Sequence, residues 1–368
     1  TGFAQGGLVR RKNAMSVIGQ SFIGVVVGCL QWYVWGYSLT FGPDSGNGFI
    51  GDPSTYAWFE NVSPYNCIEG QTIPHLLYAA FQMTFALMVP VLITGAWAEK
   101  FSLFSAVQFM IIWPVLVYYP TAHWVWGGGW LAANPYNSDE SRAVDYAGGI
   151  VIHTASGIAS LVVALVLQKR RAFKQGSDEY TSNLPLTMVG IALVWVGWYS
   201  FNGGSGLRAN GQAVSALFVT QIAACTSAAV WCACSYFDDG YVQITHLGSG
   251  ALAGLAGITP GSGYVSHLAG VPYGIIVGLC SFYGGKALKE RLKLDDVLDV
   301  TSLQAIPGAV GSILVGFFAD SRVLPCAGPE FPGKACDGTD DHLDGVLYGG
   351  NGDLLAWQLA AVIVQIVW

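Results

Sequence analysis

Asp145-Tyr-Ala-Gly-Gly-Ile-Val-Ile-His153-Thr-Ala-Ser-Gly157 places an acid, several small residues and a histidine at the start of an apolar run that stays uncharged to Leu167. A helix rises about 1.5 Å per residue, so if Asp145 lies at a membrane surface, His153 lies roughly 12 Å deeper, near the middle of the hydrocarbon core. An ionisable side chain at that depth indicates a functional site. The small residues on either side of it permit the close backbone contacts of packed membrane helices.

The composition excludes an ordinary water-soluble domain. The chain has 368 residues, of which 53% are hydrophobic and 11% charged, whereas a soluble domain is about 25% charged. The charges lie between ten uncharged runs, most of which reach the roughly 20 residues that a spanning helix needs. These runs are 16–41, 73–98, 101–122, 146–168, 184–203, 213–237, 241–259, 267–285, 300–319 and 354–368.

The two ends of the chain are interpreted as truncated. The last run has 15 residues because the chain stops within it, and residues 1–9 resemble the end of an earlier span. We therefore expect an all-α polytopic membrane protein, organised as one transmembrane domain over residues 1–368. The complete protein is expected to have eleven helices, with the first and the last incomplete in this sequence.

The distribution of basic residues predicts the orientation. If the loop 10–12 is cytoplasmic and successive loops alternate sides, twelve of the 16 lysines and arginines lie inside. Only Arg142, Arg208, Arg322 and Lys334 lie outside. This positive-inside bias predicts that the full chain starts outside and ends in the cytoplasm. The net charge of −7 is then mainly an acidic outer face, which favours approaching cations and does not suggest nucleic acid as a partner.

No motif predicts a cofactor, a metal ion or an enzyme. His153 has no second histidine at i+4, and neither a phosphate-binding loop nor a catalytic triad is recognisable. Cys326 and Cys336 share an outer loop, where they have the placement needed for a disulfide. Asn61-Val-Ser63 is a glycosylation sequon in another outer loop, weakened by the proline that follows it.

Two further stretches place polar or aromatic groups near the predicted path of His153. Trp124 and Trp126 end a span on the outer side, where a tryptophan is either an interfacial belt residue or a ring that faces a cation. Gln304 follows a cytoplasmic loop and lies about 10 Å into the membrane if its helix starts near Val297. Gln304 and His153 would therefore approach each other from opposite faces, which favours two inverted halves, although no sequence repeat is evident.

Taken together, these motifs resemble those of the ammonium transporter family over nearly the whole chain. The resemblance rests on Asp145-Tyr-Ala-Gly-Gly-x3-His153-x2-Ser-Gly157 and on five other segments in the family's order. These are Gly6-Gly7-x2-Arg-Arg-Lys-Asn13, Phe81-Gln82-x2-Phe85-Ala86, Ala122-His-x2-Trp126-Gly-Gly-Gly129, Trp195-x-Gly-Trp198-x2-Phe201-Asn202-x2-Ser205 and Asp295-Asp-x2-Asp299-Val300. The resemblance implies a homotrimer of eleven-helix protomers, each with two inverted pseudo-repeats and a narrow pore.

The resemblance also implies roles for single residues. Trp126 and Ser205 correspond to the outer ammonium site, the first through a cation–π contact and the second by accepting a hydrogen bond. Phe85 and Phe201 correspond to the stacked rings that close the pore below that site, and Phe85 also borders the substrate. Trp198 lines the pore, and Asp145 orders nearby backbone without touching the substrate. His153 corresponds to the first of two facing pore histidines.

The second pore histidine of the family is replaced. This chain reads Gln304-Ala-Ile-Pro-Gly308 where the family usually has His-Gly-x-Gly-Gly. A glutamine donates and accepts hydrogen bonds but does not titrate near neutral pH, so it cannot relay a proton as an imidazole does. The departure predicts a polar pore with an altered proton pathway.

We therefore expect a transporter of ammonium and methylammonium in the plasma membrane, in which ammonium loses its proton and ammonia crosses a hydrophobic pore. Two rival functions stay open. A sensor, or transceptor, would bind ammonium with little transport and act through cytoplasmic regulators. A Rhesus-type gas channel is disfavoured because it does not need the cation site that Trp126 supplies. An enzyme is disfavoured because no second catalytic group is identifiable.

Overall fold

A computed structural model describes residues 1–68, 72–132, 142–174, 181–324 and 343–368, which are nearly all helical. Four spans of the described chain combine α-helix with a π-helical turn. The helices of the first half are α1 (Gly2–Leu8), α2 (Arg11–Gln31) continued by η1 (Trp32–Gly36) and α3 (Tyr37–Phe41), α4 (His75–Ile93), α5 (Leu103–Trp113) continued by η3 (Pro114–Tyr118) and α6 (Tyr119–Trp126), and η4 (Gly149–Thr154) with α7 (Ala155–Val166).

The second half continues in the same manner. A short helix, α8 (Arg171–Lys174), joins the halves. It is followed by α9 (Leu184–Gly204), α10 (Gly211–Asp239), α11 (Ile244–Ile258), α12 (Gly270–Leu292), η6 (Thr301–Ala305) with α13 (Ile306–Phe318), and α14 (Asp353–Val367). Single 3₁₀ turns lie at η2 (Ala57–Phe59), η5 (His267–Ala269), η7 (Ser321–Val323) and η9 (Val346–Tyr348).

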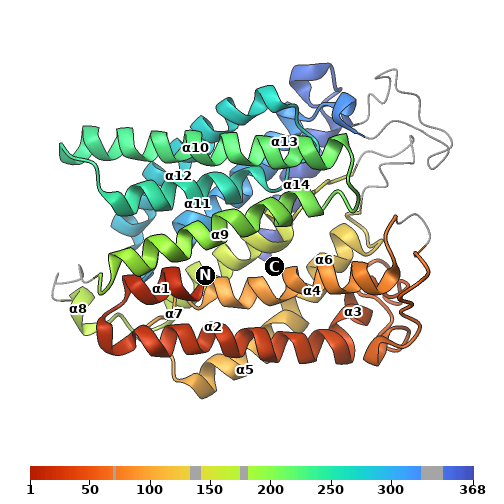
Figure 1. The fold of residues 1–368 in the computed structure, drawn as a ribbon, viewed down its shortest axis with the longest axis horizontal. Coiled ribbons are helices and arrows are strands. Elements are labelled where there is room, and N and C mark those ends of the chain that lie inside the picture. The colour runs from red at the N-terminus through yellow and green to blue at the C-terminus, as the bar shows by residue number, and fades with distance from the viewer. Residues whose placement is uncertain (69–71, 133–141, 175–180, 325–342) are drawn as a thin grey trace.

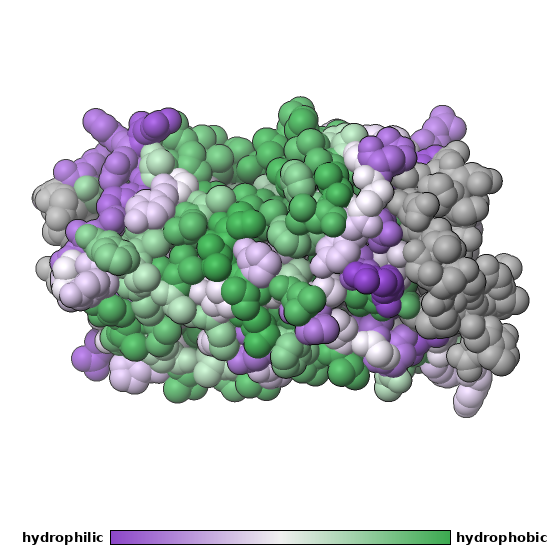
Figure 2. All heavy atoms as spheres, turned by 90° about the horizontal axis from the view of Figure 1, so that it is seen from above, coloured by the Kyte–Doolittle hydropathy of each residue, from purple (hydrophilic) through white to green (hydrophobic). Residues whose placement is uncertain are grey.

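The uncharged runs of the sequence coincide with these helices, which confirms the all-α membrane fold. Eight helical segments of the described chain are long and apolar enough to cross a membrane, and α11 and α14 are shorter apolar helices. Figure 1 shows most of these helices lying side by side along the long axis of the molecule. On the face seen in Figure 2, hydrophobic side chains occupy the middle and hydrophilic ones gather toward both ends. This distribution is what a bilayer-spanning bundle requires.

Several boundaries differ from the sequence prediction, two of them in the first half of the chain. The run at 73–98 is helical only to Ile93, and the run at 16–41 belongs to a span that starts five residues earlier, at Arg11. At the end of α4, Nε2 of Gln5 lies 3.5 Å from the backbone oxygen of Val91 and 3.4 Å from that of Leu92. The turns that follow include Glu99, which has a positive φ of 67°. The contact with Gln5 joins residues far apart in the sequence, so hydrophobicity alone does not reveal it.

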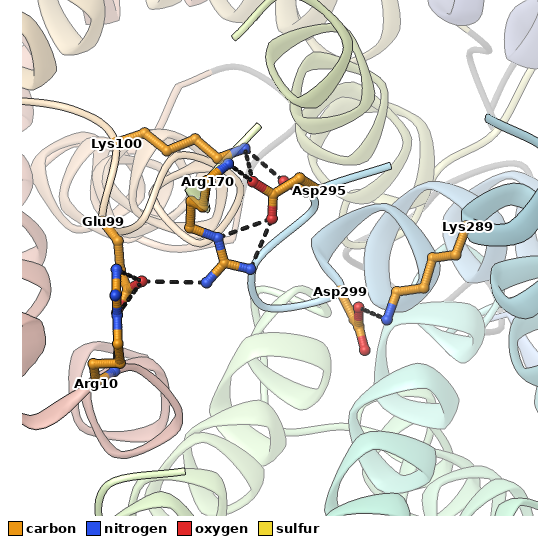
Figure 3. Close-up of polar contacts among 7 residues, drawn as sticks. All are labelled: Arg10, Glu99, Lys100, Arg170, Lys289, Asp295 and Asp299. Atoms are coloured by element: carbon orange, nitrogen blue, oxygen red, sulfur yellow. Dashed lines mark hydrogen bonds and ion pairs between the residues drawn. The ribbon is translucent and has the colours of Figure 1, made fainter. Parts of the chain in front are cut away.

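Charged side chains join the loops at one end of the bundle, which we call the basic end and define by Arg10, Glu99, Lys100, Arg170 and Asp295. Glu99 is paired with Arg10 at 2.7 Å and with Arg170 at 3.2 Å. Asp295 is paired with Arg170 at 2.7 Å and with Lys100 at 3.2 Å. Figure 3 shows that these five residues form one connected cluster. The cluster therefore joins four loops that the distribution of basic residues assigns to the same side.

The halves of the fold meet through two helices that start at opposite ends. The first starts at Gly149 and ends before Arg170 of the basic end, whereas the second starts after Asp295 of that same end. Each carries an aspartate eight residues before its central polar side chain, Asp145 before His153 and Asp296 before Gln304. Both polar side chains lie in π-helical turns. This correspondence supports the inverted arrangement expected from the sequence.

Glycines allow these two helices to cross at van der Waals distance. A Cβ atom at Gly157 would lie 2.0 Å from the backbone nitrogen of Ala305, and one at Gly308 would lie 2.7 Å from Cβ of His153. Each glycine comes four residues after the polar side chain of its own helix. The crossing therefore brings His153 and Gln304 to the same level.

Candidate functional site

Five aromatic rings form a column that runs inward from the end opposite the basic end. Trp126 meets Phe85 edge-on with 5.8 Å between ring centroids, and Phe85 lies 4.5 Å from Phe201. Phe201 in turn lies 5.3 Å from Trp198, which stacks on His153 at 5.3 Å with an interplanar angle of 19°. We call Trp126, Phe85, Phe201, Trp198 and His153 the ring column. It brings together side chains from α4, α6, η4 and α9.

The column ends in a hydrogen bond between the two halves of the fold. Nδ1 of His153 lies 2.6 Å from Oε1 of Gln304, and both side chains are buried. An amide oxygen only accepts hydrogen bonds, so Nδ1 of His153 carries the proton and donates it. The other ring nitrogen, Nε2, is then an acceptor, and it has no partner among the described residues. The pair therefore leaves one lone pair, on Nε2 of His153, available to a small N–H donor in surroundings that are otherwise mainly aromatic.

Tryptophan indole groups fix the outer and inner parts of the column. Nε1 of Trp126 donates to the backbone oxygen of Asp145 at 2.7 Å, so the loop before η4 sets the orientation of this ring. Nε1 of Trp198 donates to Oγ1 of Thr259 at 2.9 Å, and that hydroxyl donates to the oxygen of Leu255. Because each indole N–H has a fixed acceptor, only the ring faces of Trp126 and Trp198 are offered to a passing ligand.

Ser205 lies at the end of α9, one helical turn beyond Phe201. Its hydroxyl donates to the oxygen of Phe201 at 2.8 Å. The hydroxyl proton is therefore engaged in a hydrogen bond to the helix backbone, whereas the hydroxyl oxygen can still accept a hydrogen bond. Ser205 is only partly buried. This arrangement suits a group that accepts a hydrogen bond from a cation near the mouth of the column.

Asp145 acts on backbone and does not enter the column. Its carboxylate is 4% exposed and accepts the N–H groups of Gly148, Gly149, Ile150 and Val151 at 2.7 to 3.1 Å. These are the N–H groups that the first turn of a helix leaves without intrahelical partners. Gly148 has a φ of 117°, a conformation that a side chain would disfavour. Asp145 therefore holds the start of η4 and, through its own carbonyl oxygen, the ring of Trp126.

A cavity of about 850 Å³ lies on the other side of Gln304. Besides Gln304 and Trp198, it is lined by Arg170 and Asp295 of the basic end and by Asp296. We call this cavity the vestibule. It places Gln304 between the ring column and a chamber with charged walls.

Several residues that position the site were not identified from the sequence. Oγ1 of Thr259 accepts the indole N–H of Trp198, which lies 61 residues away in the sequence. The side-chain amide of Gln358 in α14 accepts from the backbone N–H of Val144 and donates to the backbone oxygen of the same residue. Their signal in the sequence is only a polar side chain within an apolar run, which many packing residues share. Asp296 of the vestibule does have a signal in the sequence, because its spacing to Gln304 repeats that of Asp145 to His153.

The peripheral sequence predictions have separate outcomes. Asn61 is exposed, and its Nδ2 donates to the oxygen of Thr55 at 3.0 Å. Glycosylation there stays a prediction. Cys326 and Cys336 lie outside the described residues. A search of the described residues finds no group of three His, Cys, Asp or Glu side chains that could hold a metal ion.

Comparisons with known proteins agree over the full chain. A family model described as Ammonium Transporter Family matches residues 1–368. Ammonium transporter 1 of Dictyostelium discoideum is 41% identical over 368 residues, which are 100% of this chain and 74% of that protein. Ammonium transporter Amt1 of Archaeoglobus fulgidus is 37% identical over 361 residues, or 98% and 82% of the two chains. The crystal structure of Saccharomyces cerevisiae Mep2 superposes with a TM-score of 0.87 at 33% identity, covering 100% of this chain and 80% of that one.

Proposed function

The chain belongs to the ammonium transporter family, and from this membership and the ring column we propose that it transports ammonium across a membrane. The observation that carries the proposal is the unbroken contact from Trp126 through Phe85, Phe201 and Trp198 to the His153–Gln304 pair. It supplies a cation-attracting mouth, an aromatic closure and a polar centre in that order. Its relatives are named as transporters, which fits a protein that is not an enzyme.

The first step is recruitment of the cation at the mouth. The face of Trp126 attracts ammonium or methylammonium through its ring quadrupole, and the hydroxyl oxygen of Ser205 accepts one of its hydrogen bonds. Asp145 does not touch the cation, because its carboxylate is occupied by four backbone N–H groups. The site is therefore electrostatically attractive without binding the cation as an ion pair, which allows release.

The second step is passage as the neutral amine. The rings of Phe85 and Phe201 close the column, and a bare cation in such an apolar region would cost several kcal/mol or more. Ammonium gives one proton to water at the outer mouth and continues as ammonia, whose N–H groups can then donate to Nε2 of His153. Potassium has no proton to lose, so selectivity follows from chemistry as well as from size.

Gln304 keeps the centre of the proposed pore polar but prevents that centre from passing a proton. Its Oε1 fixes the tautomer of His153 through the 2.6 Å bond. Because an amide does not titrate near neutral pH, a proton cannot move from His153 to residue 304 and onward. We propose that ammonia crosses this point as a neutral molecule and that any accompanying proton takes another route.

The setting of the transporter follows from the family and the charges. We propose a homotrimer in the plasma membrane, with the basic end in the cytoplasm and the start of the full chain outside, as the bias of basic residues indicates. The Rhesus-type gas channel is disfavoured because the face of Trp126 is directed to the column by its bond to Asp145. A sensor would share the mouth but would show little flux, so the two functions are separable by measuring transport.

The test is methylammonium uptake by liposomes that contain the purified full-length protein. We expect saturable uptake, and Trp126→Leu should weaken the apparent affinity about 2- to 30-fold because a cation–π contact is worth about 0.5 to 2 kcal/mol. Trp58→Leu is the matched control, since Trp58 is 58% exposed and stands in the loop before α4. Binding without uptake would favour the sensor, and unchanged uptake in Trp126→Leu would contradict the role of Trp126.

A further inference from the structure

One face of α2 and its continuation η1 carries a row of bulky side chains that the rest of the described structure leaves open. Met15, Val26, Leu30 and Tyr33 follow one another along this face and are 44% to 74% exposed. Between residues 19 and 35, each exposed residue is a glycine, an aliphatic or an aromatic residue. Figure 1 shows α2 along one side of the bundle. We call Met15, Val26, Leu30 and Tyr33 the open face.

The opposite side of the same helix packs against protein as membrane helices do. A Cβ atom at Gly24 would lie 2.9 Å from Cγ2 of Val91, and one at Gly28 would lie 2.6 Å from Cδ2 of Leu87. Membrane helices meet through such small residues, whereas the open face consists of large ones. It extends over 18 residues, which is about 27 Å of helix and close to the roughly 30 Å of a hydrocarbon core. The open face therefore has the composition and the length of a surface that contacts lipid.

Trp58 continues the open face at the end of the bundle opposite the basic end. It belongs to η2, in the loop between α3 and α4, and its ring meets that of Tyr33 edge-on with 5.8 Å between centroids. Trp58 is 58% exposed, and its indole N–H forms no hydrogen bond with any described residue. The interfacial region of a bilayer starts where the hydrocarbon core ends, and tryptophan is enriched there. A ring with an apolar body and a free N–H suits that region.

The backbone presents this ring in an unfavourable conformation. Trp58 and Phe59 both have a φ of 56°, in the left-handed region that bulky L residues rarely adopt. The loop is nevertheless fastened to α3, because Oγ of Ser38 accepts the N–H of Tyr56 at 2.8 Å and donates to the backbone oxygen of Asp52 at 2.7 Å. A strained conformation that the surrounding structure holds in place points to a function. Its result here is the exposure of one large ring.

We propose that Trp58 anchors the protein in the bilayer leaflet at the end opposite the basic end. The ring lies at the level of the glycerol and headgroups, beside acyl chains that cover the open face, and the indole N–H donates to an ester or phosphate oxygen of a phospholipid. The partner is phospholipid because the surface that leads to Trp58 is bulky, uncharged and as long as a hydrocarbon core. The anchor sets the depth of α2, which packs against α4, the helix of Phe85. The inference does not depend on the proposed transport activity.

The contact is measured on full-length protein that contains 5-fluorotryptophan and is reconstituted in phosphatidylcholine nanodiscs. The ¹⁹F resonance of Trp58 is assigned by its loss in Trp58→Phe, and that of the fully buried Trp32 by its loss in Trp32→Phe. Three paramagnetic probes are compared, namely phosphatidylcholine with a nitroxide on the headgroup, phosphatidylcholine with a nitroxide at the end of an acyl chain, and a water-soluble gadolinium chelate. We expect the headgroup nitroxide to broaden the Trp58 resonance more than either other probe does, and more than it broadens that of Trp32.

Melting temperatures in detergent supply a second readout. Added phosphatidylcholine should raise the melting temperature of native protein, because a ligand that binds the folded state stabilises it. The rise should be smaller in Trp58→Gly, which removes the ring and tolerates the positive φ. Tyr65→Ala is the matched control, since Tyr65 is 88% exposed in the same loop and has no ring contact among the described residues. Its rise should equal that of native protein.

Each contrary result has its own meaning. If the gadolinium chelate broadens the Trp58 resonance most, the loop projects into water and the anchor is refuted. If none of the three probes broadens it, protein covers Trp58, as a second copy of this chain would, and the anchor is refuted as well. An equal rise of the melting temperature in native protein and Trp58→Gly would show that the ring contributes nothing to lipid binding. Methylammonium uptake bears on transport alone, so its absence leaves the anchor to be decided by these two measurements.

Discussion

His153 donates from Nδ1 to Oε1 of Gln304 at 2.6 Å, and this bond joins the two halves of the fold at the inner end of the ring column. It fixes the proton on one nitrogen of the imidazole and leaves Nε2 as an acceptor. In a pair of histidines either ring can be the donor, whereas here only His153 can donate from its ring. In the proposed pore, this pair is therefore a fixed hydrogen-bonding station.

Replacing Gln304 tests that assignment directly. In Gln304→His, a second imidazole with an ordinary pKa near 6.5 faces His153, so the pair can hold and pass a proton. We expect ammonium-evoked currents that depend on pH between about 5.5 and 7.5 to appear or grow relative to native protein. Electrophysiology on the full-length protein with ammonium, methylammonium and potassium is the measurement.

Gln304→Leu serves as its control. Leucine removes the acceptor of His153 and leaves Nδ1 buried without a partner, at a cost of about 1 to 3 kcal/mol. Uptake should fall in this variant without any new pH dependence. Equal currents in native protein and Gln304→His at every pH would contradict the fixed-station interpretation, and the absence of ammonium current and uptake in both would contradict transport itself.

A second prediction concerns the helix crossing. In Gly157→Ala, the new methyl group would lie 2.0 Å from the backbone nitrogen of Ala305, so the helices must separate at a cost of about 1 to 3 kcal/mol or more. We expect a lower melting temperature in detergent and loss of methylammonium uptake, because His153 and Gln304 move apart. In Gly19→Ala, no atom lies within 4 Å of the added methyl group, so a stability equal to native or higher by up to about 1 kcal/mol is expected. Similar results for both variants would argue against a tight crossing.

A third prediction concerns acid stability at the basic end. Burial alone raises the pKa of Glu99, but hydrogen bonds from Arg10, Asn13 and Arg170 outweigh it and hold that pKa at about 2. Because the pKa is lowered on folding from its ordinary 4.5, the stabilisation is complete above about pH 4.5 and is lost as pH falls toward 2. Glu99→Gln should therefore be less stable than native at pH 7, by on the order of 3 kcal/mol for a broken buried ion pair.

The check is thermal unfolding of both proteins across this pH range. The difference between native protein and Glu99→Gln should be largest at neutral pH and should narrow below about pH 4.5. A matched variant, Asp353→Asn, removes an exposed acid. Its difference in stability from native protein should not narrow as the pH falls. A difference that grows on acidification would contradict the sign of the pKa change.

The sequence predicts the spans well for physical reasons, whereas the residues of the ring column were expected from the family resemblance of their motifs. Hydrophobic length is a local property, and each of the ten uncharged runs contains or closely overlaps a helix of the structure. The residues of the column stand in short motifs, and the spacing of Asp145 to His153 already placed the histidine deep in the membrane. The pairing of His153 with Gln304 was expected from their opposed depths, and the structure confirms it.

What the sequence does not reveal depends on contacts between distant segments. The hydrogen bond from Trp198 to Thr259 joins residues 61 positions apart in the sequence, and the hydrogen bonds between Gln358 and Val144 join residues 214 positions apart. The ion pairs of Arg170 with Glu99 and Asp295 are likewise not evident from the sequence, which shows only a basic cluster in an inside loop. None of these contacts leaves a local pattern, since each requires the helices to be packed before the partners meet.

The backbone contact at Gly157 also bears on the kinetics of transport. With no side chain between the helices at this point, the two halves have little freedom to slide or rock about the centre, since packed interiors resist small displacements. The parts that can move across the path are the phenyl rings of Phe85 and Phe201. Rotation of individual side chains is faster than the collective domain motions of microseconds to milliseconds. For the proposed transport we therefore expect a turnover that is set by ring rotation and proton transfer, as in a gated channel, and not by alternation of the two halves between two shapes.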